Sequence, residues 1–365
     1  MRFMKFKRFD FFYDPYLLFS IILLSVVGLV VLFSASQGDL NIIIKQSIFV
    51  FFGIFLMICV SQPDPAFYKN LSALFLVISI ILVILTILFG NEVNGAKRWL
   101  DLGFFSLQPS ELIKIALPIY LSAYLYDKSL PINLKHTFIS LIIIGISFRL
   151  IVFQPDLGTS IVVLLAGFYV LFLAGLSWKF IGSTIAIFIL SLPFLWNNLL
   201  APFQRQRIAT FLNPDADPFG TGWNITQSKI AIGSGGFFGK GYGSGSQAHL
   251  DFLPETKTDF IFAVIAEEFG FIGTLILFAI YTFILLRCFY LSFNARDRFC
   301  RLTIGGLSLV FITTILVNLG MVVGILPVVG MPLPFISMGG SSLLSFYIAF
   351  GIIISMASHK KLIRQ

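Results

Sequence analysis

Long apolar segments recur along the whole 365-residue chain, and short polar connections separate them. A helix that crosses a membrane needs about 20 predominantly apolar residues. The pattern predicts ten such helices, at 16–35, 42–61, 70–90, 109–126, 138–153, 157–175, 179–197, 259–287, 302–325 and 336–357. Two connections are clearly longer than a turn, 91–108 and 198–258. The chain is therefore predicted to be a single all-α polytopic membrane domain over 1–365, with a large loop at 198–258 between the seventh and eighth helices.

Composition supports the membrane assignment. The chain is 58% hydrophobic and only 12% charged, whereas a soluble globular chain carries about 25% charged residues. The net charge of +8 could suggest a nucleic-acid partner. The basic residues collect at the ends of apolar segments, however, so no nucleic-acid partner is expected. The three Cys and three His have no metal-ligand spacing.

The distribution of Lys and Arg predicts the orientation, because short cytoplasmic loops carry an excess of these residues. With the N-terminus in the cytoplasm, the inner loops and termini collect most of the 25 basic residues. The outer loops at 36–41, 154–156 and 326–335 hold none. Both termini are therefore predicted to be cytoplasmic, and the 198–258 loop is predicted to lie outside.

Ionisable residues inside the predicted spans are candidate functional positions, because charge at membrane depth is costly. Glu111 and Lys114 are three residues apart on the fourth helix and so share one face. They either form a structural ion pair that locks two helices or contribute to substrate binding, and the two roles can coexist. Glu267 and Glu268 lie deep in the eighth helix, where they need partners.

Two further carboxylates lie at predicted helix starts near the outer face. Asp156 opens the sixth helix, where it could cap the helix or add a binding role, with Arg149 as a plausible counter-ion. Asp259 lies where the polar outer loop meets the eighth helix, and Thr258 could be the cap, which would leave Asp259 in the first turn. A carboxylate at such a boundary is structural more often than catalytic, so its position alone leaves both roles open.

The long loop is rich in Gly over 220–245 but contains no nucleotide-binding motif. The Gly-Lys pair at 239–240 ends no P-loop, and no G-x-G-x-x-G follows a strand. The acidic and basic residues of the loop nearly balance, so an anion site has to be built from a few positions. Arg98, Arg205 and Arg207, which lie beside apolar segments, are the candidates.

Taken together, four segments resemble signatures of the SEDS family (shape, elongation, division and sporulation). They run from Asn94 to Leu112, from Gln154 to Thr159, from Leu253 to Gly270 and from Pro334 to Ser342. Within the family, the stretch from Phe211 to Gly241 is most similar to the RodA branch, which acts in elongation, and the division paralogue FtsW usually differs there. The resemblance covers nearly the whole chain, with several long motifs in the family's order.

The resemblance implies a SEDS fold with ten helices and a peptidoglycan glycosyltransferase of the bacterial cytoplasmic (inner) membrane. It implies that Asp259, at the outer start of the eighth helix, is catalytic. The predicted substrate-binding residues are Lys97, Arg98, Glu111, Lys114, Asp156, Arg205, Arg207 and Lys257. The implied donor is lipid II, polymerised with inversion into β-1,4-linked glycan. The expected partners are a class B penicillin-binding protein, which supplies transpeptidation, and the elongation machinery.

The role of Asp259 in that reaction stays open at this stage. An unperturbed Asp has a pKa of about 3.9, too acidic for an efficient base at neutral pH. Partial desolvation would raise the pKa of Asp259, and the adjacent Lys257 would lower it. Asp259 is either the general base that takes the proton of the acceptor hydroxyl or a ligand of a divalent cation, Mg²⁺ or Mn²⁺.

Two other classes of function compete with the polymerase. A lipid II flippase or other transporter also suits ten helices and charges at depth. Alternating access needs a site that both faces can reach, whereas the main polar residues of this chain gather on one face. An enzymatically silent scaffold is disfavoured because the chain retains so many intramembrane charges.

Overall fold

The computed structural model describes residues 14–93, 96–101, 103, 106–129, 131–198, 202–213, 221–249 and 255–358. Its elements are α1 (Pro15–Ala35), α2 (Leu40–Ser61), α3 (Pro65–Phe89), β1 (Asn91–Val93), β2 (Ala96–Asp101), β3 (Ser106–Leu107), α4 (Pro109–Leu125), α5 (Leu134–Val152), α6 (Leu157–Leu173), α7 (Trp178–Asn198), α8 (Pro202–Leu212), α9 (Thr221–Ser234), α10 (Ser246–His249), α11 (Ile261–Phe293), α12 (Arg298–Val323) and α13 (Ser341–Ser358). The parts of the sequence motifs at 94–95, 214–220 and 253–254, and the two chain ends, lie outside the described residues.

The ten helices predicted from the apolar pattern all form, and most of their boundaries agree to within a few residues. Within the described ranges, seven helices are long and apolar enough to cross a membrane: α1, α2, α3, α5, α11, α12 and α13. α6 is apolar but shorter. α4 has 17 residues, most of them buried, and packs against α3, α6 and α12 inside the bundle. The prediction of a helical membrane protein is confirmed.

The starts of two helices differ from the prediction. α13 begins at Ser341 rather than 336, because the preceding residues form a loop in which Pro332 and Pro334 have no N–H to donate to a helix. We call residues 324–340 the α12–α13 loop. α11 begins at Ile261 rather than 259, so Asp259 lies in the turn that precedes the helix and not in its first helical turn.

Both long connections contain regular structure that the sequence did not predict. In the first, β1 pairs with β2 and β2 with β3, each antiparallel, to make a small three-stranded sheet. The second contains α8, α9 and α10. The prediction rested on long apolar runs. The longest of these elements, α9, has only 14 residues, so none of them contains such a run.

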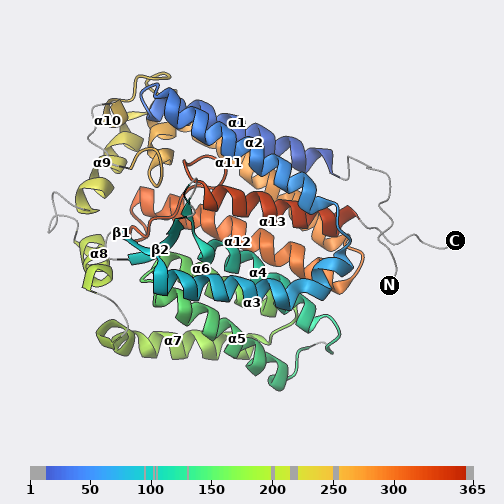
Figure 1. Ribbon diagram of the computed structural model, residues 1–365. Helices are drawn as coiled ribbons and strands as arrows, with labels where there is room; N and C mark the ends of the chain where they lie inside the picture. Colours follow the sequence, from blue (N-terminus) through green and yellow to red (C-terminus); the bar gives the residue numbers. More distant parts are fainter. Residues whose placement is uncertain are drawn as a thin grey trace.

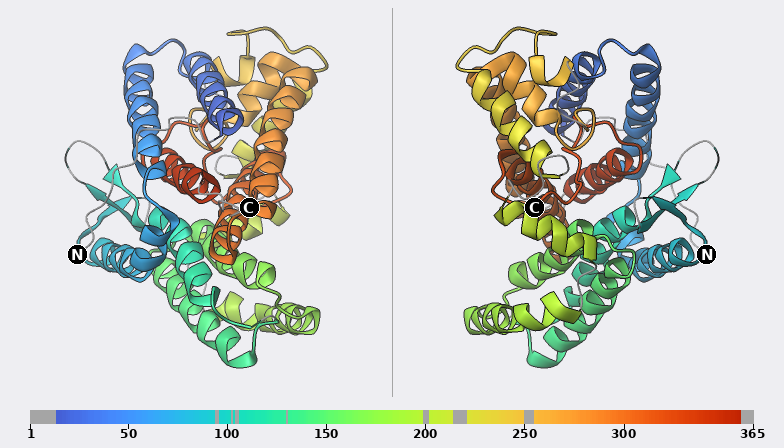
Figure 2. Two further views of the ribbon diagram at one scale, coloured as in Figure 1. Left: turned by 90° about the vertical axis from the view of Figure 1, so that its right-hand side faces the viewer. Right: turned by 90° about the vertical axis from the view of Figure 1, so that its left-hand side faces the viewer.

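The long helices run side by side, with their ends at two opposite faces of the molecule. Figure 1 shows that α1 begins and α13 ends at one end of the bundle, whereas α8, α9 and the sheet lie at the other end. We call the latter the α8 end. The views in Figure 2 place α1 and α2 on one side of the molecule and α5 and α7 on the opposite side, with α13 between them.

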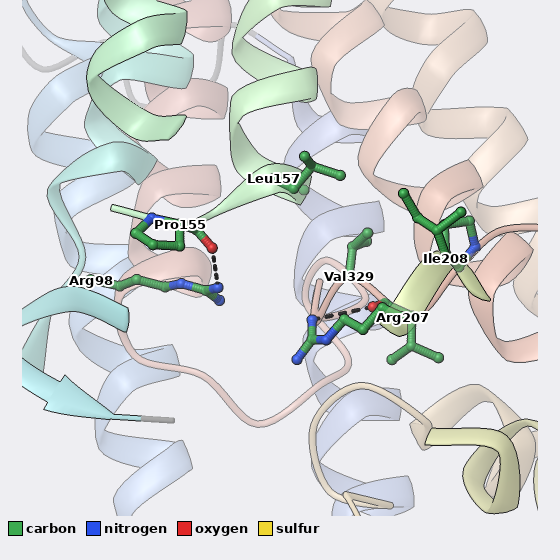
Figure 3. Close-up of a pocket in the computed structure, with 9 residues that line it drawn as sticks. Arg98, Pro155, Leu157, Arg207, Ile208 and Val329 are labelled. Carbon is green, nitrogen blue, oxygen red and sulfur yellow. Dashed lines mark hydrogen bonds between the residues drawn. The ribbon is translucent and has the colours of Figure 1, made fainter. Parts of the chain in front are cut away.

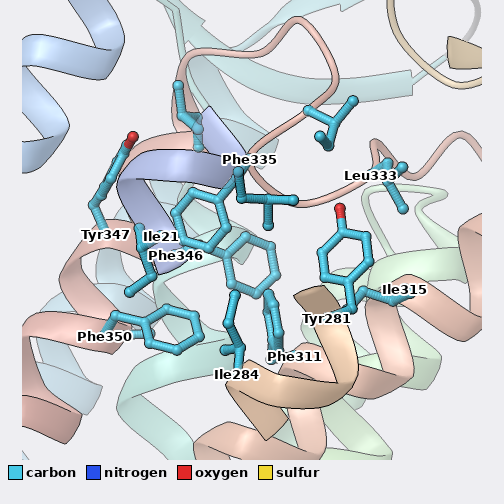
Figure 4. Packing of buried hydrophobic residues seen from close by; sticks show 14 of the residues in the cluster. Ile21, Tyr281, Ile284, Phe311, Ile315, Leu333, Phe335, Phe346, Tyr347 and Phe350 are labelled. Atoms are coloured by element: carbon cyan, nitrogen blue, oxygen red, sulfur yellow. The ribbon is translucent and has the colours of Figure 1, made fainter. Parts of the chain in front are cut away.

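Aromatic side chains hold the α12–α13 loop in the core. The ring of Phe335, a buried loop residue, lies 5.0 Å from the ring of Tyr347 and 5.5 Å from that of Phe350 (Figure 4). The neighbouring carbonyl of Pro334 accepts a hydrogen bond of 2.7 Å from the hydroxyl of Tyr281 on α11. The loop is therefore anchored by α11 and α13, and its conformation is set by the core.

A loop from the long connection docks into a break in α11. The break is at Gly270, whose φ of 64° and ψ of −158° are not helical. The N–H of Gly241 donates to the carbonyl of Glu268 at 3.0 Å, and the N–H of Phe271 donates to the carbonyl of Gly236 at 3.0 Å. Backbone groups freed by a break in an apolar environment need such partners, so the docked loop stabilises the break.

The two acidic residues of α11 have the partners that the sequence led us to expect. The fully buried Glu267 accepts from the Nζ of Lys240 at 2.6 Å and from the Oγ of Ser246 at 3.0 Å. Glu268 accepts from the hydroxyl of Ser34 on α1. These contacts connect α11 to the docked loop and to α1.

We expect Gly239→Ala to destabilise the protein more than Gly243→Ala. Both residues have positive φ, 81° and 72°, so Ala strains each by about 1–2 kcal/mol. A Cβ at Gly239 would lie 2.1 Å from the carbonyl oxygen of Glu268, whereas nothing lies within 4 Å of one at Gly243. Overpacking should therefore cost Gly239→Ala about 1–3 kcal/mol more. Thermal unfolding in detergent measures the difference, and equal midpoints would contradict the docking.

Candidate active site

Asp259 lies in the turn from Glu255 to Phe260 that precedes α11, within electrostatic reach of Arg207 on α8. The predicted cap is wrong: the hydroxyl of Thr258 donates to Glu255 Oε2 at 2.7 Å, and Phe260 occupies the N-cap position without a side-chain cap. A Cβ built on Gly330 would lie 3.4 Å from Asp259 Oδ2. The carboxyl group of Asp259 therefore lies against the backbone of the α12–α13 loop.

Two arginines from different elements reach toward each other across a pocket beside Asp259. Arg98 comes from β2 and donates through Nη2 to the carbonyl of Pro155 at 2.6 Å, and Arg207 comes from α8 and donates through Nη1 to the carbonyl of Val328 at 3.2 Å (Figure 3). The pocket encloses about 310 Å³, its open mouth included. It is lined by Arg98, Pro155, Leu157, Gly158, Arg207, Ile208, Pro327, Val328 and Val329.

The charges around the pocket act on one another. Burial lowers the pKa of Arg207 from its ordinary value and the charge of Arg98 lowers it further, while Asp259 and Asp156 oppose the shift. Burial raises the pKa of Asp259 to about 6, and the charge of Glu255 adds to the increase, whereas Arg207 and Arg98 oppose it. Asp259 is therefore a much better proton acceptor at neutral pH than an ordinary Asp.

Asp156 has the capping role and a second contact. Its Oδ1 accepts from the N–H of Thr159 at 3.2 Å, which caps α6, and its Oδ2 accepts from Gln108 Nε2 at 3.0 Å. Arg149, the expected counter-ion, has its guanidinium 4.2 Å from the ring centroid of Phe153. Asp156 interacts electrostatically with Arg207 instead. The carboxylate thus fixes the start of α6 and contributes negative charge near the pocket.

Glu111 and Lys114 form a buried ion pair on α4, with Lys114 Nζ 2.6 Å from Glu111 Oε1. The hydroxyl of Ser345 on α13 donates to Glu111 Oε2 at 3.0 Å. Both side chains of the pair are 5% exposed. Through Ser345, the ion pair connects α4 to α13. This is the first of the two roles considered from the sequence, a structural ion pair that locks two helices.

The remaining predicted residues, Lys97, Arg205 and Lys257, do not line the pocket. Lys97 is half-buried on β2, and Arg205 is half-buried on α8, two positions before Arg207. The main-chain carbonyl of Lys257 accepts from the N–H of Met338 at 2.8 Å. The cations that act on the pKa of Asp259 are Arg207 and Arg98, so the expectation that Lys257 lowers this pKa is wrong.

The sequence missed Asn318 on α12. This residue is fully buried, and its Nδ2 donates to the main-chain carbonyl of Asp259 at 2.9 Å and to that of Met331 at 2.6 Å. A buried amide needs hydrogen-bond partners. An Asn near the end of an apolar helix was therefore the signal in the sequence that could have identified this residue.

The described part of the chain holds no group of three or more His, Cys, Asp or Glu side chains that could bind a metal ion. The acidic residue that acts on Asp259 is Glu255. A divalent cation at this site would therefore take most of its ligands from elsewhere, which is how Mg²⁺ is usually held by one or two carboxylates together with substrate phosphates.

Sequence comparisons connect the chain to one family. The profile of the FtsW/RodA/SpoVE family, described as cell cycle protein, matches residues 15–362. The peptidoglycan glycosyltransferase MrdB of Escherichia coli K12 is 43% identical over 352 residues, which are 96% of this chain and 95% of that protein. The peptidoglycan glycosyltransferase RodA of Treponema pallidum is 32% identical over 421 residues, covering 94% of this chain and 97% of that protein.

Solved structures show the same likeness. A chain from a structure concerned with the coordination of polymerization and crosslinking by a peptidoglycan synthase complex has a TM-score of 0.83 at 30% identity, covering 95% of this chain and 98% of that chain. The rod shape determining protein RodA of Thermus thermophilus has a TM-score of 0.74 at 28% identity, covering 95% of this chain and 97% of that chain.

Removing one charge of the Glu111–Lys114 pair should destabilise the protein strongly. Glu111→Gln and Lys114→Met each leave an uncompensated buried charge, which costs about 3–5 kcal/mol. The double variant carries neither charge, so we expect it to be more stable than either single variant. Thermal unfolding of the three variants in detergent measures this coupling. Additive losses would show that the two charges do not compensate each other.

Proposed function

Since the chain belongs to the FtsW/RodA/SpoVE family of cell cycle proteins, we propose that it is a peptidoglycan glycosyltransferase whose reaction takes place at Asp259, Arg98 and Arg207. The predicted resemblance to the SEDS family is thereby confirmed. The observation that carries the site assignment is the position of the Asp259 carboxyl group, which lies against the backbone of Gly330 and within electrostatic reach of Arg207 and Arg98. Its raised pKa supports the assignment.

The chemistry assigns a role to each group. The acceptor is the 4-hydroxyl of a lipid-linked sugar, and Asp259 takes its proton as the new bond to the anomeric carbon of the donor forms. The bond from that carbon to the pyrophosphate oxygen breaks, and the polyprenyl pyrophosphate leaves with the electron pair. The guanidinium groups of Arg98 and Arg207 stabilise the charge that grows on the pyrophosphate. Attack opposite the leaving group gives inversion and a β-1,4 linkage.

The pocket itself is narrow. The volume of about 310 Å³ includes space open to solvent, and the cavity alone measures about 20 Å³, far below the range of about 300–1,000 Å³ for ligand pockets. The arginines therefore contact the pyrophosphate at the mouth of the pocket, and the disaccharide-peptide lies outside it. The apolar residues Leu157, Ile208 and Val329 face the polyprenyl side of the substrate.

Lys97, Arg205 and Lys257 provide further positive charge around the substrate, and Asp156 positions the start of α6. Glu111 and Lys114 act indirectly, by holding α4 against α13. Asp259 would hold a Mg²⁺ or Mn²⁺ ion together with the pyrophosphate, and the ion would supply further positive charge for the leaving group.

The location and partner follow from the same premise. The protein is a multi-pass protein of the inner membrane, with several apolar helices. We propose that both termini are cytoplasmic and that the α8 end faces outward, where lipid II is polymerised. A class B penicillin-binding protein of the elongation machinery is the proposed partner, in line with the synthase complex that contains the structural neighbour.

Transport of lipid II is the weaker alternative. The charged pair at depth, Glu111 with Lys114, is already satisfied by protein groups and is buried. The two arginines and Asp259 gather at one end of the bundle, whereas alternating access needs a site that both faces can reach. The geometry favours chemistry at one face.

Asp259→Asn should abolish glycan polymerisation and leave the protein folded, because the amide cannot accept the proton of the hydroxyl. Glu255→Gln, in the same turn, keeps the carboxyl group of Asp259 but removes a charge that adds to its pKa increase, so we expect a smaller loss of activity than in Asp259→Asn. Purified protein with lipid II, with and without its partner and a chelator, gives the glycan length on a gel. Polymerisation by Asp259→Asn at the wild-type rate would end the catalytic assignment.

A further inference from the structure

Asn318 connects the turn that carries Asp259 to the α12–α13 loop. One amide nitrogen, Nδ2, donates to the main-chain carbonyl of Asp259 at 2.9 Å and to that of Met331 at 2.6 Å. Asn318 is fully buried in α12, five residues before the last residue of the helix, Val323. Both carbonyls therefore share the donor group of this one side chain, whereas its Oδ1 has no hydrogen-bond partner within the described part of the chain.

Two more hydrogen bonds join the same pair of segments. The hydroxyl of Ser337 donates to the carbonyl of Thr258 at 2.5 Å and accepts from the N–H of Leu333 at 2.8 Å. The N–H of Met338 donates to the carbonyl of Lys257 at 2.8 Å. The carbonyls of three successive residues, 257 to 259, thus accept hydrogen bonds from the loop or from Asn318.

The loop itself has a fixed position. Phe335 packs in the aromatic core, and the carbonyl of Pro334 is held by Tyr281. On α1, a Cβ at Gly28 would lie 2.5 Å from the carbonyl oxygen of Phe335, so the loop lies directly against this helix. A displacement of the turn relative to the loop would therefore move Asp259 relative to the core.

If Asn318 only stabilised the end of α12, its hydrogen bond to Met331 would be sufficient. The second hydrogen bond goes to the carbonyl of Asp259 itself. Next to Met331, Gly330 has no side chain and so leaves room for the Asp259 carboxyl group. Asp259 is therefore in contact with the backbone of the loop at Gly330 and is hydrogen-bonded to Asn318 of α12.

We propose that Asn318 is a positioning residue for the reaction, because it holds the backbone of Asp259 against the α12–α13 loop and so fixes the carboxylate relative to Arg98 and Arg207. Asn318 acts through Asp259 and touches no substrate. The inference rests on the proposed function, since it requires Asp259 to be the group that takes the proton.

The test compares Asn318→Leu with Thr314→Val in the full-length protein, using lipid II. Leu has the same number of side-chain heavy atoms as Asn, although it is bulkier, and it donates nothing. Thr314 is buried one turn earlier on α12, and its hydroxyl bonds to Val310 within the helix, so its loss leaves Asp259 in place. A misplacement of about 1 Å can cost about 100-fold in rate. We therefore expect kcat of Asn318→Leu to fall by about 10- to 100-fold.

A positioning role predicts a split between the kinetic constants. KM for lipid II should change by less than about twofold in Asn318→Leu, since the arginines that bind the pyrophosphate keep their contacts. Thr314→Val should keep both constants. Wild-type kcat in a folded Asn318→Leu protein would overturn the proposal, and so would a loss confined to KM.

Two further variants keep the test decisive. If Asn318→Leu does not fold, Asn318→Ala, which is smaller than Asn and also donates nothing, should lower kcat in the same way; an unchanged kcat in Asn318→Ala would then overturn the proposal. Asp259→Asn is measured in parallel. Activity in Asp259→Asn would refute the proposed function, whereas an inactive Asp259→Asn with a fully active Asn318→Leu would refute this inference alone.

Discussion

Several charged groups near the α8 end are buried and paired with protein groups, and the geometry of the site follows from this constraint. A charge taken out of water is costly unless it is paired and hydrogen-bonded. Glu111 is accordingly compensated by Lys114 and Ser345, and Asp156 by Gln108 and the start of α6. Asp259 is partly buried, and this burial raises its pKa to about 6. The same burial that makes the carboxyl group costly makes it useful as a base.

The aromatic core and the site are parts of one arrangement. Phe335 fixes the α12–α13 loop among the rings of α12 and α13, and the loop in turn holds the backbone carbonyls of Lys257 and Thr258. Side chains far from the pocket therefore determine where the carboxyl group of Asp259 lies. The two arginines come from β2 and α8, elements inserted between the membrane helices, so the pocket joins the inserted segments to the bundle.

The sequence predicted the ten helices well, because each depends on a local apolar run of sufficient length. It also predicted Asp156 as a cap and the Glu111–Lys114 contact, which depend on spacings of three residues. It did not predict the small sheet, α8 to α10 or the break at Gly270, since these depend on contacts between distant segments. Asn318 was missed for the same reason: its two acceptors lie 59 and 13 residues away in the chain. Lys257 lies only two residues before Asp259 in the chain, yet the cations that lower the pKa of Asp259 are the distant Arg207 and Arg98.

The most direct measurement is the protonation of Asp259 itself, followed by infrared difference spectroscopy of the protein in lipid nanodiscs. The carboxyl signal is the part of the wild-type titration that Asp259→Asn lacks. The account predicts a midpoint near pH 6 that moves to higher pH in Arg207→Met, because loss of the cation disfavours the carboxylate. A midpoint at the ordinary Asp value of about 3.9, unchanged in Arg207→Met, would contradict the account.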